Sequence, residues 1–355
     1  MPLNLPNKDQ YVLRIVSDGN SIFNEFDTAN NFILENKNID TITVGETDDF
    51  ETATTLAKAL DLVGNNGTII ITKDLQNEEC YNDRTVSIIG NNRTLTNCNI
   101  KNDGILTVND LTFTDSNNSV ITNNNELYIE HCTFIDNNAQ YGAAIYIVSK
   151  NKNTEIINCV FNHNVASLYG GAIFSNKGND VTIQYCTFGE LNCANNHGSS
   201  ISTNGNMYIK ENIFYNNRGN DEIYVMNGTL EAEDNYFEGS ITNINNLNGN
   251  VSANLNYWGY NNIDDIEQTW AGQVIVDNWL ISHYEVHYTE PVLGNVQTHI
   301  QGKISQYQSR LKTEITSYKD LEGKMKLGEY YYDLNSEQIT NEDVLYIGQQ
   351  EFTLR

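Results

Sequence analysis

The sequence contains little proline, few basic residues and no long apolar run. Only 3 of its 355 residues are proline. This scarcity favours stacked strands, because almost every backbone amide in them must donate a hydrogen bond. Lysine and arginine number 20 against 46 aspartates and glutamates, so the formal net charge is −26. That charge repels phosphate backbones and anionic lipid, and we therefore expect no nucleic-acid partner.

No apolar stretch is long enough to cross a bilayer, so we expect no membrane insertion. The opening MPLNLPNKDQYVLRIV also lacks the basic start and apolar centre of a signal peptide. No Cys-x-x-Cys pair indicates zinc. The sequence thus implies no metal ligand and no cofactor.

Two central segments, YIEHCTFIDNNAQYGAAIYI and EIINCVFNHNVASLYGGAIFS, follow one pattern. Two apolar residues alternate with polar ones, a small polar residue or cysteine follows, and an aromatic residue comes two positions later. From Phe113 to Trp258 these aromatic positions are 21 to 27 residues apart. The repeats, each given by its four pattern positions, are Leu106/Val108/Leu111/Phe113, Leu127/Ile129/Cys132/Phe134, Thr154/Ile156/Cys159/Phe161 (Thr154 fitting weakly), Val181/Ile183/Cys186/Phe188, Met207/Ile209/Asn212/Phe214, Leu230/Ala232/Asn235/Phe237 and Val251/Ala253/Asn256/Trp258.

Alternation with a period of two predicts strands rather than helices. A single unit cannot bury its apolar face, whereas stacked units share one core. A repeat of this length suits one turn of a parallel β-helix, in which strands lie about 4.8 Å apart. We therefore predict a mainly β fold, with a parallel β-helix over residues 65–290.

Stacking in register also aligns like side chains into ladders. The pattern predicts one ladder of Cys132, Cys159 and Cys186, and one of Asn212, Asn235 and Asn256. A disulfide framework is the alternative for the six cysteines. We expect buried free thiols instead, because the aligned cysteines occupy core positions that face the same way.

Several short motifs resemble those of known surface proteins. FIDN, FNHN, GAAI and GGAI resemble the FxxN and GGA(I/L/V) repeats of chlamydial polymorphic outer-membrane proteins. The ordered set from GILTVNDLTF to NYWG and VDNWLI is similar to the adhesin-like proteins of methanogenic archaea, over roughly residues 67–281. The resemblance implies a right-handed, pectin-lyase-like parallel β-helix, an extracellular location and a role in surface attachment.

The two ends differ from the repeats. Residues 1–64 have the pattern of a small α/β module for capping or attachment. Its last helix, in DFETATTLAKALDLVG, would stop at Gly64 and cover the first turn. Residues 291–355 form a C-terminal module. Apolar residues at helical intervals predict a helix from about Val296 to Leu321, followed by short strands. That helix could pair with copies of itself and give a homo-oligomer such as a trimer. The alternative, implied by the resemblance, is a small β-sandwich.

These features together predict a non-enzymatic attachment protein that recognises a cell-surface glycan or cell-wall polymer of a host. It would belong to a methanogen surface or act as the receptor-binding tail protein of an archaeal virus. The location would be extracellular, on the cell surface or the virion tail, and the missing signal peptide favours the virus slightly. A structural spacer rod is a further alternative.

A polysaccharide lyase or glycoside hydrolase on the same scaffold is the enzymatic alternative. Lyase chemistry needs a basic residue beside acidic ligands, but Arg84 and Arg93 have no acidic cluster in the following turns. Hydrolysis needs two facing carboxylates. The pairs Asp48–Asp49 and Asp264–Asp265 are not repeated in neighbouring turns, and NNHG around His197 has no acidic partner nearby in the sequence. We predict no catalytic residue.

Three residues form a candidate glycan-binding row. Tyr141, Tyr169 and His197 each precede a glycine of the repeat, so stacking would align them on one outer face. Aligned rings on a polar surface suit the apolar faces of sugars. The alternative is that they are ordinary corner residues without a ligand.

Overall fold

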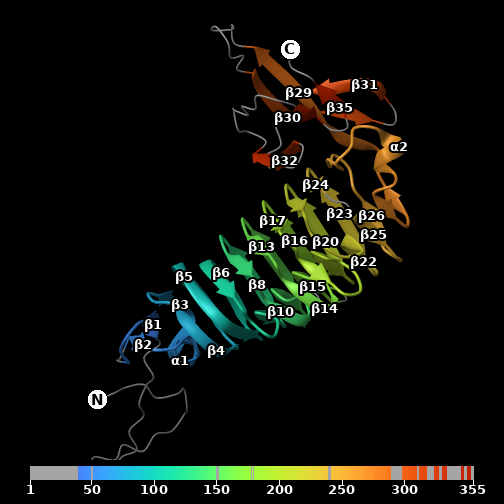
Figure 1. Cartoon of the computed structure of the whole chain (residues 1–355). Helices are drawn as coiled ribbons and strands as arrows, with labels where there is room; N and C mark the ends of the chain where they lie inside the picture. The colour runs from blue at the N-terminus through green and yellow to red at the C-terminus, as the bar shows by residue number, and fades with distance from the viewer. Residues whose placement is uncertain are drawn as a thin grey trace, which may run out of the picture.

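The computed structural model describes residues 39–48, 51–148, 152–176, 178, 180–238, 241–288, 298–309, 312–317, 324–327, 330–333, 345–347 and 350–352. Parallel strands coil into a β-solenoid of about 10 turns, which confirms the predicted fold class. Helix α1 (Leu56–Leu62) lies at its N-terminal end, and the short helix α2 (Ile263–Ile266) lies near its C-terminal end (Figure 1). Neither of these helices has the length and apolar character needed to cross a membrane.

Three faces run along the solenoid, and each is a stack of parallel strands. The first face contains β1 (Ile39–Val44), β3 (Val63–Ile71), the first parts of β5 (Thr85–Asn102) and β6 (Ile105–Thr114), β8 (Glu126–Glu130), β12 (Asn153–Ile157), β16 (Asp180–Gln184), β20 (Asn206–Lys210), β23 (Thr229–Glu233), β26 (Asn250–Ser252) and β28 (Val274–Ile275). The second contains the first part of β4 (Leu75–Asn82), later parts of β5 and β6, β9 (Thr133–Ile135), β13 (Val160–Asn162), β17 (Thr187–Gly189), β21 (Ile213–Tyr215) and β24 (Tyr236–Glu238).

The third face contains the ends of β4 and β5, β7 (Ile121–Asn123), β11 (Ile145–Ile147), β15 (Ile173–Ser175), β19 (Ile201–Thr203), β22 (Asp221–Val225), β25 (Thr242–Asn246) and β27 (Trp270–Ala271). A smaller stack between the second and third faces contains β10 (Asn138–Tyr141), β14 (Val165–Tyr169) and β18 (Cys193–Ala194). The short β2 (Thr52–Ala53) pairs with β1.

A ladder of stacked rings forms the core behind the second face. Neighbouring ring centroids are 4.7–5.2 Å apart, and all seven rings are buried. The ladder consists of Phe113, Phe134, Phe161, Phe188, Phe214, Phe237 and Trp258. The repeated aromatic residues therefore share one continuous core, as the sequence predicted.

The predicted cysteine and asparagine ladders are parts of one column. The backbone amide of Cys159 donates to Sγ of Cys186, and the amide of Cys186 donates to Oδ1 of Asn212 at 2.9 Å. Asn212 continues the column to Asn235 at 3.0 Å. Cys132, Cys159 and Cys186 are buried and free, and none of the six cysteines is in a disulfide.

We expect thiol titration of the denatured protein to find 6 free thiols. Titration without denaturant should find far fewer, because five of the cysteines are buried. The reagent reacts with thiolate, and the neighbouring thiol of Cys159, together with burial, raises the pKa of Cys132 well above its usual value. Recovery of no thiol after denaturation would contradict this arrangement.

A second asparagine ladder uses the asparagine of the FxxN motif in three of its turns, and in the remaining turn Asn192 follows Phe188 by four residues. Asn137, Asn164, Asn192 and Asn217 occupy one buried column. Nδ2 of Asn164 donates to Oδ1 of Asn192 at 3.1 Å, and Nδ2 of Asn192 donates to Oδ1 of Asn217 at 3.1 Å. The same amides cap carbonyl groups of the preceding turn, such as that of Phe161. The asparagine thus satisfies the backbone where the chain leaves the second face.

The corner between the first and second faces needs a left-handed residue in each turn. The residue before the third pattern position of each repeat has a φ of 51° to 57°. That third position is Leu111 in the first repeat and a cysteine or an asparagine in the others. The residues before it are Asp110, His131, Asn158, Tyr185, Glu211, Asp234 and Leu255. Asparagine and aspartate tolerate this conformation better than other side chains do.

Replacing Tyr185 with asparagine should therefore raise the free energy of unfolding by about 1 kcal/mol. Tyr185 has a φ of 56° and is 51% exposed, so little packing is lost. Denaturant unfolding of the variant and the wild type measures the change. The reverse exchange, Asn158→Tyr at the same corner, should lower stability by a similar amount, and equal stabilities of all three proteins would contradict the strain.

The solenoid begins earlier than residue 65. Strand β1 pairs in parallel with β3, and Ile42 and Val44 belong to the common core. The predicted helix is shorter, because Thr55 caps α1 at its start and the chain becomes strand at Val63. Leu56 and Leu60 pack into the core, so α1 covers the first turn as expected. Residues 1–38 lie outside the described part.

One further turn follows Trp258. Val274 pairs with Val251, Trp279 lies opposite Asn256, and Val276, Trp279 and Ile281 are buried. This turn lies within the predicted range of 65–290, but the repeat motif does not extend to it, because Trp279 replaces the small polar residue and Ile281 follows where an aromatic residue was expected.

The helix predicted from Val296 to Leu321 is wrong. Residues of this segment form β30 (Thr298–Ser309) and β31 (Lys312–Ser317), and β30 pairs antiparallel with β29 (Asn278–Tyr288). Ile300 and Ile304 are four residues apart, a spacing that fits both a helix and one side of a strand. The remaining described strands pair as two hairpins, β32 (Lys324–Leu327) with β33 (Tyr330–Asp333) and β34 (Leu345–Ile347) with β35 (Gln350–Phe352). The predicted homo-oligomer was to form by pairing of this helix, so the structure gives no support for that mode of association.

Candidate functional site

The structure brings the three predicted site residues into one row. Tyr141 on β10 pairs with Tyr169 on β14, and Tyr169 pairs with His197 in the next turn. The rings of Tyr141 and Tyr169 stack, with centroids 6.4 Å apart and planes 13° apart. All three side chains are partly exposed. The row therefore spans three consecutive turns of the solenoid.

The glycine after each row residue fixes the position of its ring. Gly142, Gly170 and Gly198 have φ values of 45°, 65° and 71°. A Cβ atom at any of them would collide with the carbonyl oxygen three residues ahead. Only glycine allows the backbone to turn sharply at this point, where the chain enters the third face. This explains why a glycine follows each of the three row residues.

A second set of rings lies on the third face beside this row, and sequence reasoning missed it. Tyr146, Phe174 and Tyr224 are outward residues of β11, β15 and β22. Phe174 lies 5.1 Å from Tyr141, and Tyr224 lies 4.2 Å from His197, measured between ring centroids. Phe174 and Tyr224 are only 6% and 8% exposed, so the outer row covers them. We call the six residues Tyr141, Tyr146, Tyr169, Phe174, His197 and Tyr224 the aromatic corner.

His197 has an acidic partner, contrary to the expectation from its sequence neighbours. Its Nδ1 lies 2.7 Å from Oδ2 of Asp221, which is fully buried. Asp221 also accepts hydrogen bonds from the amide of Gly198 and from Nδ2 of Asn245. The partner is 24 residues away and becomes a neighbour only through stacking of the turns. The arrangement holds the imidazole in one orientation.

The next residue, Glu222, is a buried carboxyl group whose hydrogen-bond donors, Ser200 and Asn217, do not belong to the aromatic corner. Its Oε2 accepts from Ser200 at 2.7 Å and from Asn217 at 3.0 Å, whereas Oε1 has no partner. Burial raises the pKa of Glu222 to about 7, and the charge of Asp221 adds to this effect. The hydrogen bonds from Ser200 and Asn217 oppose it.

The aromatic corner lies on an uncharged stretch of an otherwise acidic protein. Residues 137–149, 164–176 and 191–209, which supply its first three turns, contain no aspartate, glutamate, lysine or arginine. The corner therefore offers rings, hydroxyl groups and amides to a ligand. Among the described residues, the carboxylate that contacts the corner is that of Asp221, and it is fully buried.

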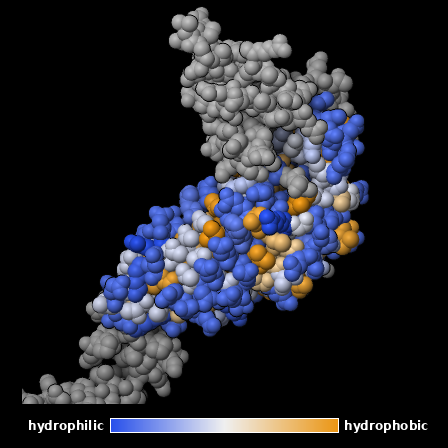
Figure 2. Space-filling model, in the orientation of Figure 1, coloured by the Kyte–Doolittle hydropathy of each residue, from blue (hydrophilic) through white to orange (hydrophobic). Residues whose placement is uncertain are grey.

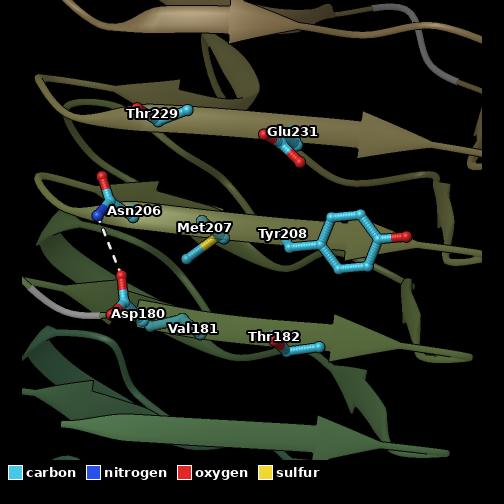
Figure 3. Close-up of a pocket in the computed structure, with 8 residues that line it drawn as sticks. All are labelled: Asp180, Val181, Thr182, Asn206, Met207, Tyr208, Thr229 and Glu231. Carbon is cyan, nitrogen blue, oxygen red and sulfur yellow. Dashed lines mark hydrogen bonds between the residues drawn. The ribbon is translucent and has the colours of Figure 1, made fainter.

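A shallow groove on the first face is a separate feature. It has a volume of about 330 Å³, and Tyr208 lies on its middle strand, between Thr182 and Glu231 of the neighbouring strands (Figure 3). Nδ2 of Asn206 donates to Oδ1 of Asp180 at 3.0 Å at one end. Figure 2 shows that the side of the solenoid in view is mainly hydrophilic, with apolar residues in separate patches. None of the predicted site residues lines this groove.

The other residues weighed for catalysis do not form a site. Arg84 donates to the carbonyl of Val63 and contacts Asp83. Asp48 is in an ion pair with Lys58 at 2.8 Å, and Asp49 lies outside the described residues. Asp264 and Asp265 are in the first turn of α2. Within the described ranges, no three His, Cys, Asp or Glu side chains gather closely enough to hold a metal ion.

Comparisons with known proteins do not identify a family. No family model matches the chain, and neither the curated proteins nor the solved structures give a match.

Proposed function

We propose that the protein is a non-enzymatic attachment protein that binds a cell-surface glycan or cell-wall polymer through the aromatic corner. The observation that carries the proposal is the row of Tyr141, Tyr169 and His197, aligned and partly exposed across three turns. Aromatic rings bind the apolar faces of sugars, and rings on a rigid support lose little freedom on binding. The inner rings supply that support.

The repeats support a place outside the cell. Their similarity to adhesin-like proteins suggests a methanogen surface, or the tail of a virus that infects such a cell. The host glycan or wall polymer would then be the partner. A row of similar contacts gives weak binding to each sugar, so display of several copies should raise the apparent affinity strongly.

The second candidate function is cleavage of a polysaccharide on the same scaffold. The hydrogen bond between His197 and Asp221 favours it, because a carboxylate in this position orients an imidazole that takes up a proton. The row itself favours binding over cleavage. Its three residues can contact a ligand along several turns of the solenoid, whereas a cleavage site acts on a single glycosidic bond.

Incubation with methanogen envelopes distinguishes the candidates. We expect the wild-type protein to sediment with the envelopes, more strongly when it is displayed in several copies, and to release no soluble sugar. Release of oligosaccharide would establish an enzyme instead. If the protein neither sediments with the envelopes nor releases sugar, the remaining alternative is a structural spacer rod. Bovine serum albumin in place of the protein controls for trapping in the pellet.

A further inference from the structure

We propose that the ligand of the aromatic corner is an uncharged glycan, one sugar of which contacts the exposed edge of the Tyr169 ring and hydrogen-bonds to Nε2 of His197. Asp221 is the positioning residue that makes this hydrogen bond possible. The inference rests on the proposed function and names the class of sugar that it involves.

The orientation of His197 follows from its partner. A carboxylate only accepts hydrogen bonds, so the contact with Asp221 places the imidazole hydrogen on Nδ1. Nε2 of the neutral ring is then an acceptor, and it has no hydrogen bond to any described residue. The side chain is 33% exposed. Nε2 is therefore the atom of this residue that a sugar hydroxyl can reach.

Neighbouring groups hold the imidazole and its carboxylate in place. Tyr224 stacks on the ring of His197, with planes 19° apart, and the rings of Tyr224 and Tyr169 are 6.1 Å apart and nearly parallel. Asn245 donates to the same oxygen of Asp221 as His197 does, at 2.8 Å. The hydrogen-bonding group and the stacking ring thus occupy adjacent turns, about 4.8 Å apart along the solenoid. One sugar can contact both.

The absence of charge around the row decides the class of sugar. A uronic acid would need a lysine or arginine to replace its hydration, and the three stretches that form the row supply none. An amino sugar would need a carboxylate, but Asp221 is buried and both its oxygens are already occupied. Charges elsewhere on the protein are screened over about 8 Å at physiological salt. A neutral sugar is therefore the class that loses the least hydration free energy on entering the site.

The test is competition for envelope binding. Envelope polysaccharide is fragmented and separated by ion exchange into neutral, anionic and cationic fractions, and each is added to the sedimentation assay with wild-type protein. We expect the neutral fraction to release the protein from the envelopes. Release by the anionic or the cationic fraction alone would overturn the inference and leave attachment standing.

Variants locate the contact. Tyr169→Ala and His197→Ala should each weaken binding about tenfold. Asp221→Asn keeps the shape but lets an amide donate to Nδ1, so Nε2 then carries the hydrogen. We expect this variant to bind less tightly than the wild type. Its new amide also faces Nδ2 of Asn245, a donor that Asp221 accepts from in the wild type, so we expect a lower melting temperature and compare binding where both proteins are folded. Tyr81→Ala, an exposed aromatic residue elsewhere, serves as the matched control and should bind normally.

The outcomes separate the two proposals. Envelope binding that persists in folded Tyr169→Ala and His197→Ala proteins would overturn the inference but not attachment. No envelope binding by the wild type would overturn the proposed function, and the inference with it.

Discussion

Replacing Phe161 with alanine is expected to lower the free energy of unfolding by roughly 3–5 kcal/mol. Phe161 is fully buried between Phe134 and Phe188, with ring centroids 5.1 and 4.7 Å away. Alanine leaves a cavity in the middle of the ladder, and the rings above and below are held by their own strands. They cannot collapse into the space, so the cavity remains.

Denaturant unfolding followed by circular dichroism measures the loss. Phe161→Leu fills most of the space and should cost clearly less than alanine. The exposed Tyr81 provides a surface control, and Tyr81→Ala should have little effect. A change of less than about 1 kcal/mol for Phe161→Ala would contradict the buried ladder.

Replacing Glu222 with glutamine is expected to stabilise the protein at alkaline pH and to leave it nearly unchanged in acid. The pKa of this carboxyl group is raised to about 7 because burial disfavours its charge. The folded state therefore binds the proton more tightly than the unfolded state does. The stability from this proton is complete below the unfolded value of 4.5 and is lost as the pH rises through about 7.

The size of the effect follows from the same shift. The difference in unfolding free energy between Glu222→Gln and the wild type should grow from near zero at about pH 4 to roughly 3 kcal/mol at about pH 9. Comparing the two proteins cancels the titration of other acidic groups. The exposed Glu231→Gln is a control that should show no such growth. A difference that does not change with pH would contradict the burial of a titrating carboxyl group.

The sequence predicted the solenoid because each turn repeats the same inward side chains. The phenylalanine ladder, the cysteine positions and the row of Tyr141, Tyr169 and His197 all follow from one alignment of the repeats. The last turn falls within the predicted range of 65–290, but the alignment of the repeats ends before it, because Trp279 and Ile281 depart from the pattern. The C-terminal helix was predicted from apolar residues at intervals of three and four residues, of which a strand satisfies only those of four, such as Ile300 to Ile304.

The rest of the site could not be read from the repeats. Tyr146 and Phe174 are outward residues after the repeated glycine, where the sequence pattern places no requirement. Asp221 follows His197 by one whole turn, and the turn that contains it lacks the repeated Gly-small-Ala-Ile motif. Its register with Gly198 and His197 depends on the length of the loop before β22. Such contacts between turns require the structure.

The most direct test of the central claim is a crystal structure of the protein grown with the neutral envelope fraction at saturating concentration. The account predicts a sugar against the ring of Tyr169, with a hydroxyl group within hydrogen-bond distance of Nε2 of His197. A sugar bound only in the groove around Tyr208, or an empty aromatic corner at saturation, would contradict it.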